Sequence, residues 1–294
     1  MKNLIEHFEK KLILKNRIFL KNGIPRIPDI KDIIKLSFTG ENTLKDFSNS
    51  AKVIFKEFNT NTSVLIKINM NSSNNYPAST SIEMLEVVIK SLIDVGVKRI
   101  CVGDCSGLMH LPTRKVIKEK ELFFLKKKYG VKLIFFDYGG WVKVPIMGEY
   151  FKNIILSDRV YKYDKIINLS NLKSHLRSEF SFSTKLLVGF MHPYQRYELH
   201  KDHIKERIAE LSLAVKPDIS IIDARKIFID GGPDTGVIKS ANTIIIDTNL
   251  FDADISAYNL LYFFKKQNGI DDIKKDPLRS IFFKHFIKIN KIFI

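Results

Sequence analysis

The sequence has few of the residues that stabilise extracellular proteins or hold metal clusters. Cys101 and Cys105 are the two cysteines among its 294 residues. Two cysteines form no disulfide framework in a chain of this length, and a structural zinc or iron–sulfur site usually takes about four ligands, mostly cysteine. We therefore expect a protein of the reducing cytosol that contains no iron–sulfur cluster.

Long apolar segments are missing as well. No run of about eighteen apolar residues occurs, so no transmembrane helix is expected. Charged side chains interrupt residues 1–23 every few positions, which excludes the apolar core of a signal peptide. Both observations favour a cytoplasmic protein. The basic residues of this N-terminal stretch leave peripheral membrane contact open, although we favour a solvated helix face.

Arginine is scarce although the chain is strongly basic. The net charge is +16, and 10 of the 48 basic residues are arginine. Proteins that bind nucleic acid usually contain arginine clusters with interleaved aromatic residues or a known module, and neither is visible. We therefore do not expect a nucleic-acid partner. The lysine excess, with abundant isoleucine and asparagine, reflects either compositional bias or a surface that attracts anions.

The chain contains apolar, β-branched runs that alternate with helical patterns. Five of these runs are predicted strands of one sheet: Ser63–Ile68, Arg99–Gly103, Lys165–Leu169, Ile219–Asp223 and Thr243–Ile246. An apolar stripe over residues 81–95 predicts a helix between the first two, which makes a parallel crossover unit. The fold class is therefore predicted as α/β, a mostly parallel sheet with helices on both faces.

The remaining segments complete the expected organisation. Residues 1–55 are predicted to form a helical or irregular extension, residues 56–265 the α/β domain, and residues 266–294 a basic C-terminal helix packed on that domain. Gly139 and Gly140 mark a small inserted hairpin within residues 138–150. A single helix is expected over residues 194–215.

One basic segment, Lys173 to His203, is the strongest candidate for a functional site. Four of the seven histidines lie in it, and it follows a predicted strand. Ligands bind at the carboxyl ends of parallel strands, histidine transfers protons near neutral pH, and lysine anchors anions or acts as a nucleophile when desolvated. The predicted catalytic residues are His175, His200 and Lys173. The alternative is a solvated basic loop and helix face.

Lys185 is predicted to anchor a cofactor or anion from the first turn of a helix that begins near residues 181–184. His175 would lie in the loop after the strand Lys165–Leu169, so that the chain can turn back toward Lys185. Pro193 should begin the next helix, and Arg196, His200 and His203 would share one face of it. The spacing does not match a zinc-protease motif, so no metal ligand is assigned.

Loops after other strands supply further candidates for binding. Asn69 follows the first strand, and Asp104, Ser106 and Gly107 follow the second, where backbone N–H groups would face an anion. An ordinary strand-to-helix turn is an equal alternative. Gly232 and Gly236 form either a rigid turn or an anion-binding nest. Asp104 or Asp223 would orient the histidines.

An ordered set of motifs resembles the uncharacterised family called domain of unknown function 362. The matching residues are VLIKINM with Lys67 and Asn69, Pro77 and Thr80 before a helix ending at Gly96, VGDCSG, the LKSH motif followed by Lys185 and Gly189, His200, DAR, Gly232-Pro233-x-x-Gly236 and Asp254. The resemblance implies that Lys67 joins the cofactor-binding candidates. Some members of that family carry ferredoxin-like cysteine clusters, which are missing here.

A second resemblance lies in the sequence spacing of four residues. His175, Lys185, Gly189 and His200 are spaced as in nickel-pincer lactate racemases, in which a lysine holds the pincer nucleotide and histidines bind nickel and transfer protons. The resemblance implies a nickel-pincer cofactor, with His200 as a potential metal ligand. The glycine-rich stretch before the racemase lysine is replaced here by Phe180-Ser181-Phe182-Ser183-Thr184.

These observations predict an enzyme that acts on a small anionic substrate through lysines and histidines at the strand ends. Racemase-like or redox chemistry with a nucleotide or metal cofactor is one version. The alternative is a non-catalytic protein that binds anions or nucleic acid through its basic surface. Geometry separates the two, because an enzyme requires Lys173, His175, Lys185 and His200 to converge on one cleft.

Overall fold

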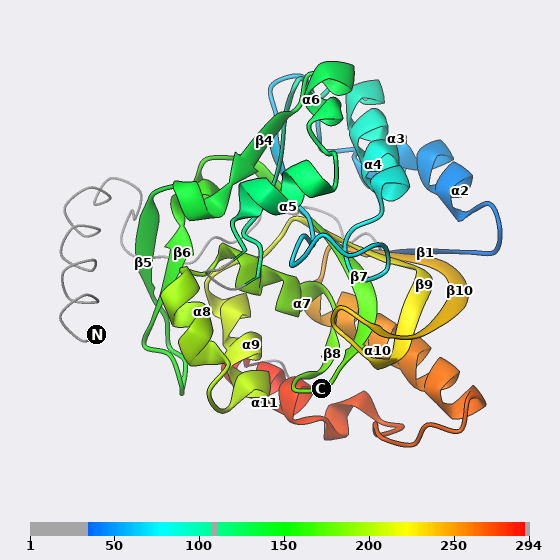
Figure 1. Cartoon of the computed structure of the whole chain (residues 1–294), viewed down its shortest axis with the longest axis vertical. Helices are drawn as coiled ribbons and strands as arrows, with labels where there is room; N and C mark the ends of the chain where they lie inside the picture. The colour runs from blue at the N-terminus through cyan, green and yellow to red at the C-terminus, as the bar shows by residue number, and fades with distance from the viewer. Residues whose placement is uncertain (1–34, 108–110, 292–294) are drawn as a thin grey trace.

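A central sheet organises the computed structural model, which describes residues 35–107 and 111–291 (Figure 1). The strand order is β1-β10-β9-β7-β2-β3-β4, and β8 pairs with β7. The strands are β1 Lys35–Thr39, β2 Ser63–Lys67, β3 Arg99–Asp104, β4 Lys132–Phe135, β7 Lys165–His175, β8 Glu179–Ser181, β9 Ile219–Gly231 and β10 Gly236–Asp247. Residues 1–34, part of the predicted N-terminal extension, lie outside the described residues.

The sheet is parallel from β9 to β4, and antiparallel pairing is added at its other edge. Strands β9, β7, β2, β3 and β4 run parallel to one another, whereas β10 pairs antiparallel with β9 on one side and with β1 on the other. The predicted mostly parallel sheet is therefore confirmed, with Thr243–Ile246 in it as part of antiparallel β10. Strand β1 falls in a stretch predicted to be helical or irregular, and its alternation of half-buried and exposed residues gives it no apolar run.

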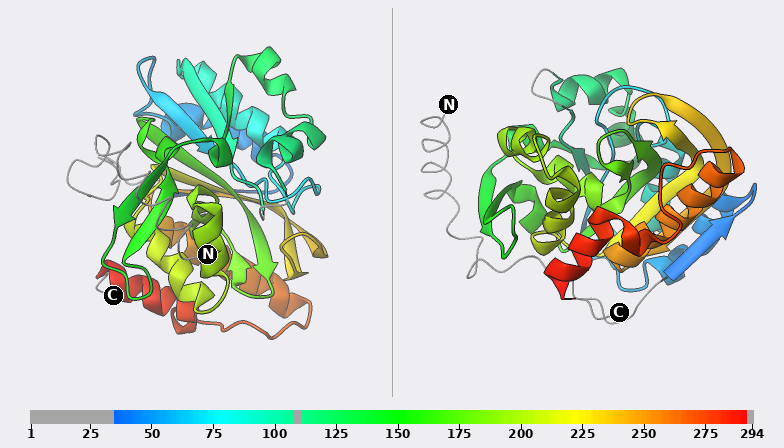
Figure 2. Two further views of the ribbon diagram at one scale, coloured as in Figure 1. Left: turned by 60° about the vertical axis from the view of Figure 1, so that its left-hand side comes forward. Right: turned by 90° about the horizontal axis from the view of Figure 1, so that it is seen from below.

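Helices cover both faces of the sheet, as predicted (Figure 2). In β2, Val64 and Ile66 pack on one face and Leu65 on the other, because side chains alternate along a strand. The first face carries α2 Thr43–Asn49, α3 Ala51–Ile54, α4 Ile82–Asp94, α5 Thr113–Glu119 and α6 Phe124–Tyr129. The second carries α7 Ser183–Leu186, α8 Pro193–Leu199, α9 Ile204–Glu210, α10 Leu250–Gln267 and α11 Ile281–Asn290.

The predicted inserted hairpin is present and extends further than expected. Strands β5 Trp141–Pro145 and β6 Asn153–Ser157 pair antiparallel outside the main sheet. Buried Glu210 of α9 accepts N–H groups from Glu149, Tyr150 and Phe151, which ties the tip of this hairpin to the domain. Short 3-10 turns complete the elements: η1 Phe136–Tyr138, η2 Asp158–Tyr161, η3 Leu187–Phe190, η4 Leu211–Leu213 and η5 Pro277–Arg279.

Two local predictions around the candidate site were wrong. The single helix expected over residues 194–215 is two helices, α8 and α9, separated by a turn in which His203 has a φ of 46°. Arg196, His200 and His203 therefore share no continuous helix face. His175 ends strand β7 instead of lying in a loop, because β8 and β9 provide hydrogen-bonding partners beyond the predicted strand end.

The geometry around Lys185 follows the prediction. Helix α7 begins at Ser183, within the expected range, and Lys185 lies in its first turn. Strands β7 and β9 continue past the carboxyl ends of β2 and β3, and η3 brings the chain back over those ends. Within the described residues, no helix is long and apolar enough to cross a membrane.

Candidate active site

A cavity of about 660 Å³ lies at the carboxyl ends of β2, β3 and β7, and we call it the strand-end cavity. Its wall comes from five parts of the chain: the ends of β2 and β3 with the residues that follow them, the extended part of β7, residues 181–201, and the turn between β9 and β10. The charged residues and histidines that line it are Lys67, Asp104, Lys173, His175, Arg177, Lys185, Arg196, His200, Lys201 and Asp234. Asn69 and Gly107 line it too. Convergence of four residues on one cleft was expected for an enzyme and not for a protein that binds through its basic surface. All four line this cavity: Lys173, His175, Lys185 and His200.

The ion pair between Lys67 and Asp104 forms the floor. The Lys67 Nζ lies 2.5 Å from Asp104 Oδ1 and also donates to the carbonyl oxygen of Ile68. Asp104 accepts the backbone N–H groups of Met70 and Cys105 as well. Burial lowers the pKa of Lys67, and Asp104 opposes this shift. This pair is thus charge-balanced, and it fixes the ends of β2 and β3.

Gly189 allows η3 to pass directly over this ion pair. A Cβ atom at this position would lie 2.6 Å from Lys67 Nζ and would overlap the Asp104 carboxylate. Any larger residue would therefore push η3 away from the strand ends, and it would displace the adjacent helix α7 with its lysine.

Lys173 and Lys185 face the cavity with little compensation of their charge. The Lys173 Nζ donates to the carbonyl oxygen of Ala78 at 2.7 Å, and burial lowers its pKa to about 8. Lys185 has no hydrogen bond or ion pair within the described residues. Burial and then the charge of Lys173 lower the pKa of Lys185 to about 7. The side chain is half-buried, so its amine is reachable from the cavity.

Helix α7 is held by a buried carboxylate from a distant segment. Asp254 of α10 accepts the N–H groups of Ser183 and Thr184, at 2.8 and 3.1 Å. Burial raises the pKa of Asp254 to about 7. These bonds satisfy the first N–H groups of the helix and fix the turn that carries Lys185.

The two predicted catalytic histidines present different ring nitrogens. His175 Nδ1 accepts the N–H groups of Arg177 and Ser178, so the proton of the neutral ring is on Nε2. His200 Nδ1 lies 2.7 Å from the carbonyl oxygen of Arg196, and because a carbonyl only accepts, Nδ1 carries the proton. His175 therefore offers a donor at Nε2, whereas His200 offers a lone pair at Nε2.

The electrostatic environment keeps both rings neutral near pH 7. Burial, then Lys185 and Lys173, lower the pKa of His175 to about 2. Burial also lowers the pKa of His200. His175 is thus suited to donate a hydrogen bond and not to take up a proton, whereas His200 is suited to accept a proton.

The family of the chain accounts for the order of these motifs. A family model described as domain of unknown function (DUF362) matches residues 64–259. The chain belongs to this family. No curated protein matches the chain. The DUF362 match begins in β2 and ends in α10, so it includes every element that lines the strand-end cavity.

Three of the predicted binding residues of this DUF362 protein lie outside the cavity lining. The Ser106 N–H donates to Thr113 Oγ1, at the start of α5. Gly232 and Gly236 form the tight turn between β9 and β10, where the Gly232 N–H donates to the carbonyl oxygen of Thr235. The rigid-turn interpretation of these glycines therefore fits the geometry.

The same turn brings a carboxylate that the sequence did not single out. Pro233 and Asp234 reach the cavity, and Ser72 Oγ donates to Asp234 Oδ1 at 2.9 Å. Asp234 raises the pKa of Lys173 and Lys185, against the effect of burial. A carboxylate in a GGPDTG turn is common enough that no sequence signal separated it from a turn residue.

The Arg196 side chain lines the cavity, but it is hydrogen-bonded to another residue of the same chain. Its guanidinium donates to the carbonyl oxygen of Cys105 at 2.8 Å and to Cys105 Sγ at 2.9 Å. Burial raises the pKa of the Cys105 thiol, although Arg196 opposes this shift. The thiol is therefore protonated at neutral pH, which favours a small buried thiol over a nucleophile.

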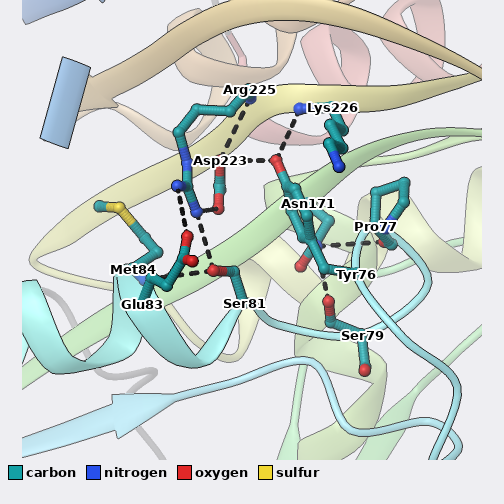
Figure 3. A network of polar contacts seen from close by, with 10 residues as sticks. All are labelled: Tyr76, Pro77, Ser79, Ser81, Glu83, Met84, Asn171, Asp223, Arg225 and Lys226. Atoms are coloured by element: carbon teal, nitrogen blue, oxygen red, sulfur yellow. Dashed lines mark hydrogen bonds and ion pairs between the residues drawn. The ribbon is translucent and has the colours of Figure 1, made fainter. Parts of the chain in front are cut away.

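The loop between β2 and α4 is fastened across β7 and β9 by a polar cluster that we call the loop latch, formed by Tyr76, Ser81, Glu83, Asp223 and Arg225 (Figure 3). Tyr76 Oη donates to Asp223 Oδ1 at 2.8 Å, and Arg225 bonds both oxygens of Asp223. Asp223 therefore holds a loop, and Asp104 an ion pair, so neither is used to orient a histidine.

No group of three or more potential metal ligands occurs within the described residues. His200 has a free lone pair at Nε2, but no second and third protein ligand gather around it there. A metal at this site would therefore take most of its ligands from a bound cofactor or substrate.

Proposed function

We propose that the protein is an enzyme that binds a small anion in the strand-end cavity and transfers a proton through His200. The observation that carries this proposal is the charge imbalance of the cavity. Asp104 compensates Lys67 and Glu198 pairs with Lys201, which leaves Asp234 to face Lys173 and Lys185. A bound anion would supply the missing charge at low cost, because the cations are already desolvated.

The histidines give this anion site a chemical role. His200 Nε2 can remove a proton from a bound molecule, and His175 Nε2–H can donate to an oxygen on which negative charge develops. Lys173 lies near both that donor and Lys185, as its effects on their pKa values indicate. This set suits abstraction of a proton from a carbon next to a carbonyl or carboxylate group.

A bound cofactor is one version of this proposal. Lys185 and His200 are the residues that would hold a nickel-pincer nucleotide, which would supply hydride chemistry. Among the described residues the amine of Lys185 has no partner and the His200 lone pair at Nε2 is available, so these two residues fit such a group. Lys67 and Asn69 would contribute to the floor beneath it.

A non-catalytic anion-binding protein is the alternative from another class. It would use the same cations without the histidines. The opposed protonation of His175 and His200 supports the enzyme, since simple binding requires no lone pair in a cationic cavity. The volume of about 660 Å³ suits a small molecule and not a nucleic-acid strand.

The test measures binding and proton exchange separately. Titration calorimetry with oxalate should show binding, and Lys173→Met should weaken it at least about tenfold, or about 1.4 kcal/mol. Lys201→Met is the matched control. Lys201 lies at the mouth, half-exposed and paired with Glu198 at 2.7 Å, so this variant should change the affinity less than about twofold.

Catalysis is tested by following deuterium from solvent into the methyl group of pyruvate by NMR. The protein should accelerate this exchange, and His200→Gln should abolish it while oxalate still binds. Oxalate binding without any exchange would favour the non-catalytic alternative. If the wild type and Lys173→Met bind oxalate with equal affinity, the strand-end cavity is not the anion-binding site.

A further inference from the structure

Lys185 differs from the other lysines of the strand-end cavity, because it has no partner among the residues that the structure describes. Lys67 pairs with Asp104, Lys173 donates to the carbonyl oxygen of Ala78, and Lys201 pairs with Glu198. The Lys185 amine has no hydrogen bond or ion pair within the described part of the chain and lines the cavity. Three lysines are thus tied in place, and the fourth is free to react.

The backbone of Lys185 is nevertheless held firmly. Asp254 accepts the first two N–H groups of α7, and Asn168 Nδ2 of β7 donates to the carbonyl oxygen of Ser183 at 2.7 Å. Asp254 and Asn168 are fully buried. The fold therefore uses two buried polar side chains to position a lysine whose amine has no hydrogen bond or ion pair to the described residues, which is the arrangement of a positioned nucleophile.

The environment also keeps the amine reactive at neutral pH. With a pKa of about 7, roughly half of the Lys185 side chains are uncharged at pH 7. An exposed lysine has a pKa near 10.4, so its uncharged fraction at pH 7 is on the order of a thousandfold smaller. Burial and then the charge of Lys173 lower this pKa, and that charge also attracts an anionic reaction partner.

We propose that Lys185 forms an imine with the carbonyl carbon of a small anionic aldehyde or 2-oxo acid. This inference rests on the proposed function, because the carboxylate of that molecule would be bound by Lys173 and by the N–H of His175. The carbonyl compound supplies the electrophile, and Lys185 supplies the electron pair. No oxidant or reductant takes part.

The step balances as follows. The amine nitrogen forms a bond to the carbonyl carbon, and the carbonyl π electrons move to oxygen. His200 Nε2 removes a proton from the nitrogen and returns it to that oxygen, which gives a neutral carbinolamine. The hydroxyl group then leaves with a solvent proton as water, and the nitrogen lone pair forms the C=N⁺ bond of a protonated imine.

Reductive trapping tests this step on the full chain. Glyoxylate is added with sodium cyanoborohydride at pH 7, and the labelled lysines are mapped by peptide mass spectrometry. We expect one adduct per chain, on Lys185, formed at least about a hundredfold faster than on exposed lysines because of the larger uncharged fraction. Oxalate, which lacks a reactive carbonyl, should slow the labelling by occupying the same cavity.

Two variants make the result specific. Lys185→Met retains the length of the side chain and should lose the fast adduct, whereas Lys201→Met, at the mouth of the same cavity, should label as the wild type does. Oxalate binding without preferential labelling of Lys185 would overturn the imine and leave the proposed function standing. Failure of oxalate to bind or to protect would contradict the proposed function itself.

Discussion

The loop latch and the strand-end cavity are two polar clusters at the same edge of one sheet, and they differ in how far their charges are compensated by neighbouring residues. In the latch, Asp223 accepts hydrogen bonds from Tyr76 Oη and from Nε and Nη2 of Arg225, and Arg225 also donates to Ser81 and Glu83. In the cavity, Lys185 has no partner within the described residues and Lys173 donates to a neutral carbonyl oxygen. Charge is matched in one cluster and left unmatched in the other.

The pKa values of the buried cations record this difference. Burial lowers the pKa of Arg225, but Asp223 outweighs it, and the net shift is upward. Burial and the charge of the nearby Lys173 together lower the pKa of Lys185 to about 7, and Asp234 only partly opposes this shift. The latch therefore stabilises the folded chain by itself, whereas the cavity reaches its full complement of interactions only with an anion bound.

The largest effect on stability is expected at the ion pair of Lys67 and Asp104, because here the cavity, like the latch, compensates a buried charge with a protein counter-ion. Asp104→Asn leaves the Lys67 ammonium buried without its counter-ion, so the free energy of unfolding should fall by about 3–5 kcal/mol. Urea denaturation measures this change. The double variant Lys67→Met/Asp104→Asn removes both charges and should recover part of the loss. A single variant as stable as the wild type would show that the pair contributes nothing.

A smaller effect is expected from opening the latch. Arg225→Met removes the charge-assisted bonds to Asp223 and Ser81, which should lower the free energy of unfolding by about 2 kcal/mol in urea. The oxalate affinity of the folded protein should change less than about threefold, since Arg225 does not line the cavity. Loss of oxalate binding together with stability would mean that the two clusters are one functional unit.

The smallest loss of stability is expected for Lys185→Met, because this variant removes a buried charge and should be at least as stable as the wild type at pH 7. Its pH dependence is the sharper readout. The folded-state pKa of about 7 lies below the unfolded value of 10.5, so the unfolded chain binds more protons between these values and stability rises with pH.

Thermal melts at pH 7 and pH 9 measure this rise. The melting temperature of the wild type should gain stabilisation that Lys185→Met does not, because methionine has no proton to lose. Lys201→Met serves as the control and should behave as the wild type. Identical pH dependence in the wild type and Lys185→Met would mean that Lys185 keeps an ordinary pKa and that the cavity is balanced after all.

Local pattern determined much of what the sequence could predict. β-branched runs located the strands, since buried parallel strands need apolar residues on both faces. The strand ends then located Lys173, Lys185 and His200, because every parallel strand delivers its last residues to the same edge. The start of α7 followed from the serine- and threonine-rich run before Lys185.

Contacts between segments that are distant in sequence determined the features that local pattern did not predict. Strand β7 reaches His175 because β8 and β9 bond its far end, and β1 exists because β10 accepts it. The break between α8 and α9 depends on His203 adopting a left-handed backbone, which the spacing of polar residues does not reveal. Asp234 entered the cavity through a hairpin turn whose position depends on the whole sheet.

The bond from Asp254 to α7 spans 71 residues and sets an order of events during synthesis. Lys67, Lys173, His175, Lys185 and His200 all leave the ribosome before Asp254 does. A nascent chain that already contains the full set of lysines and histidines therefore still lacks the carboxylate that fixes the turn of Lys185. Translation must continue into α10 before the free amine takes up its final position, so the reactive group is assembled late, when most of the domain that encloses it has been made.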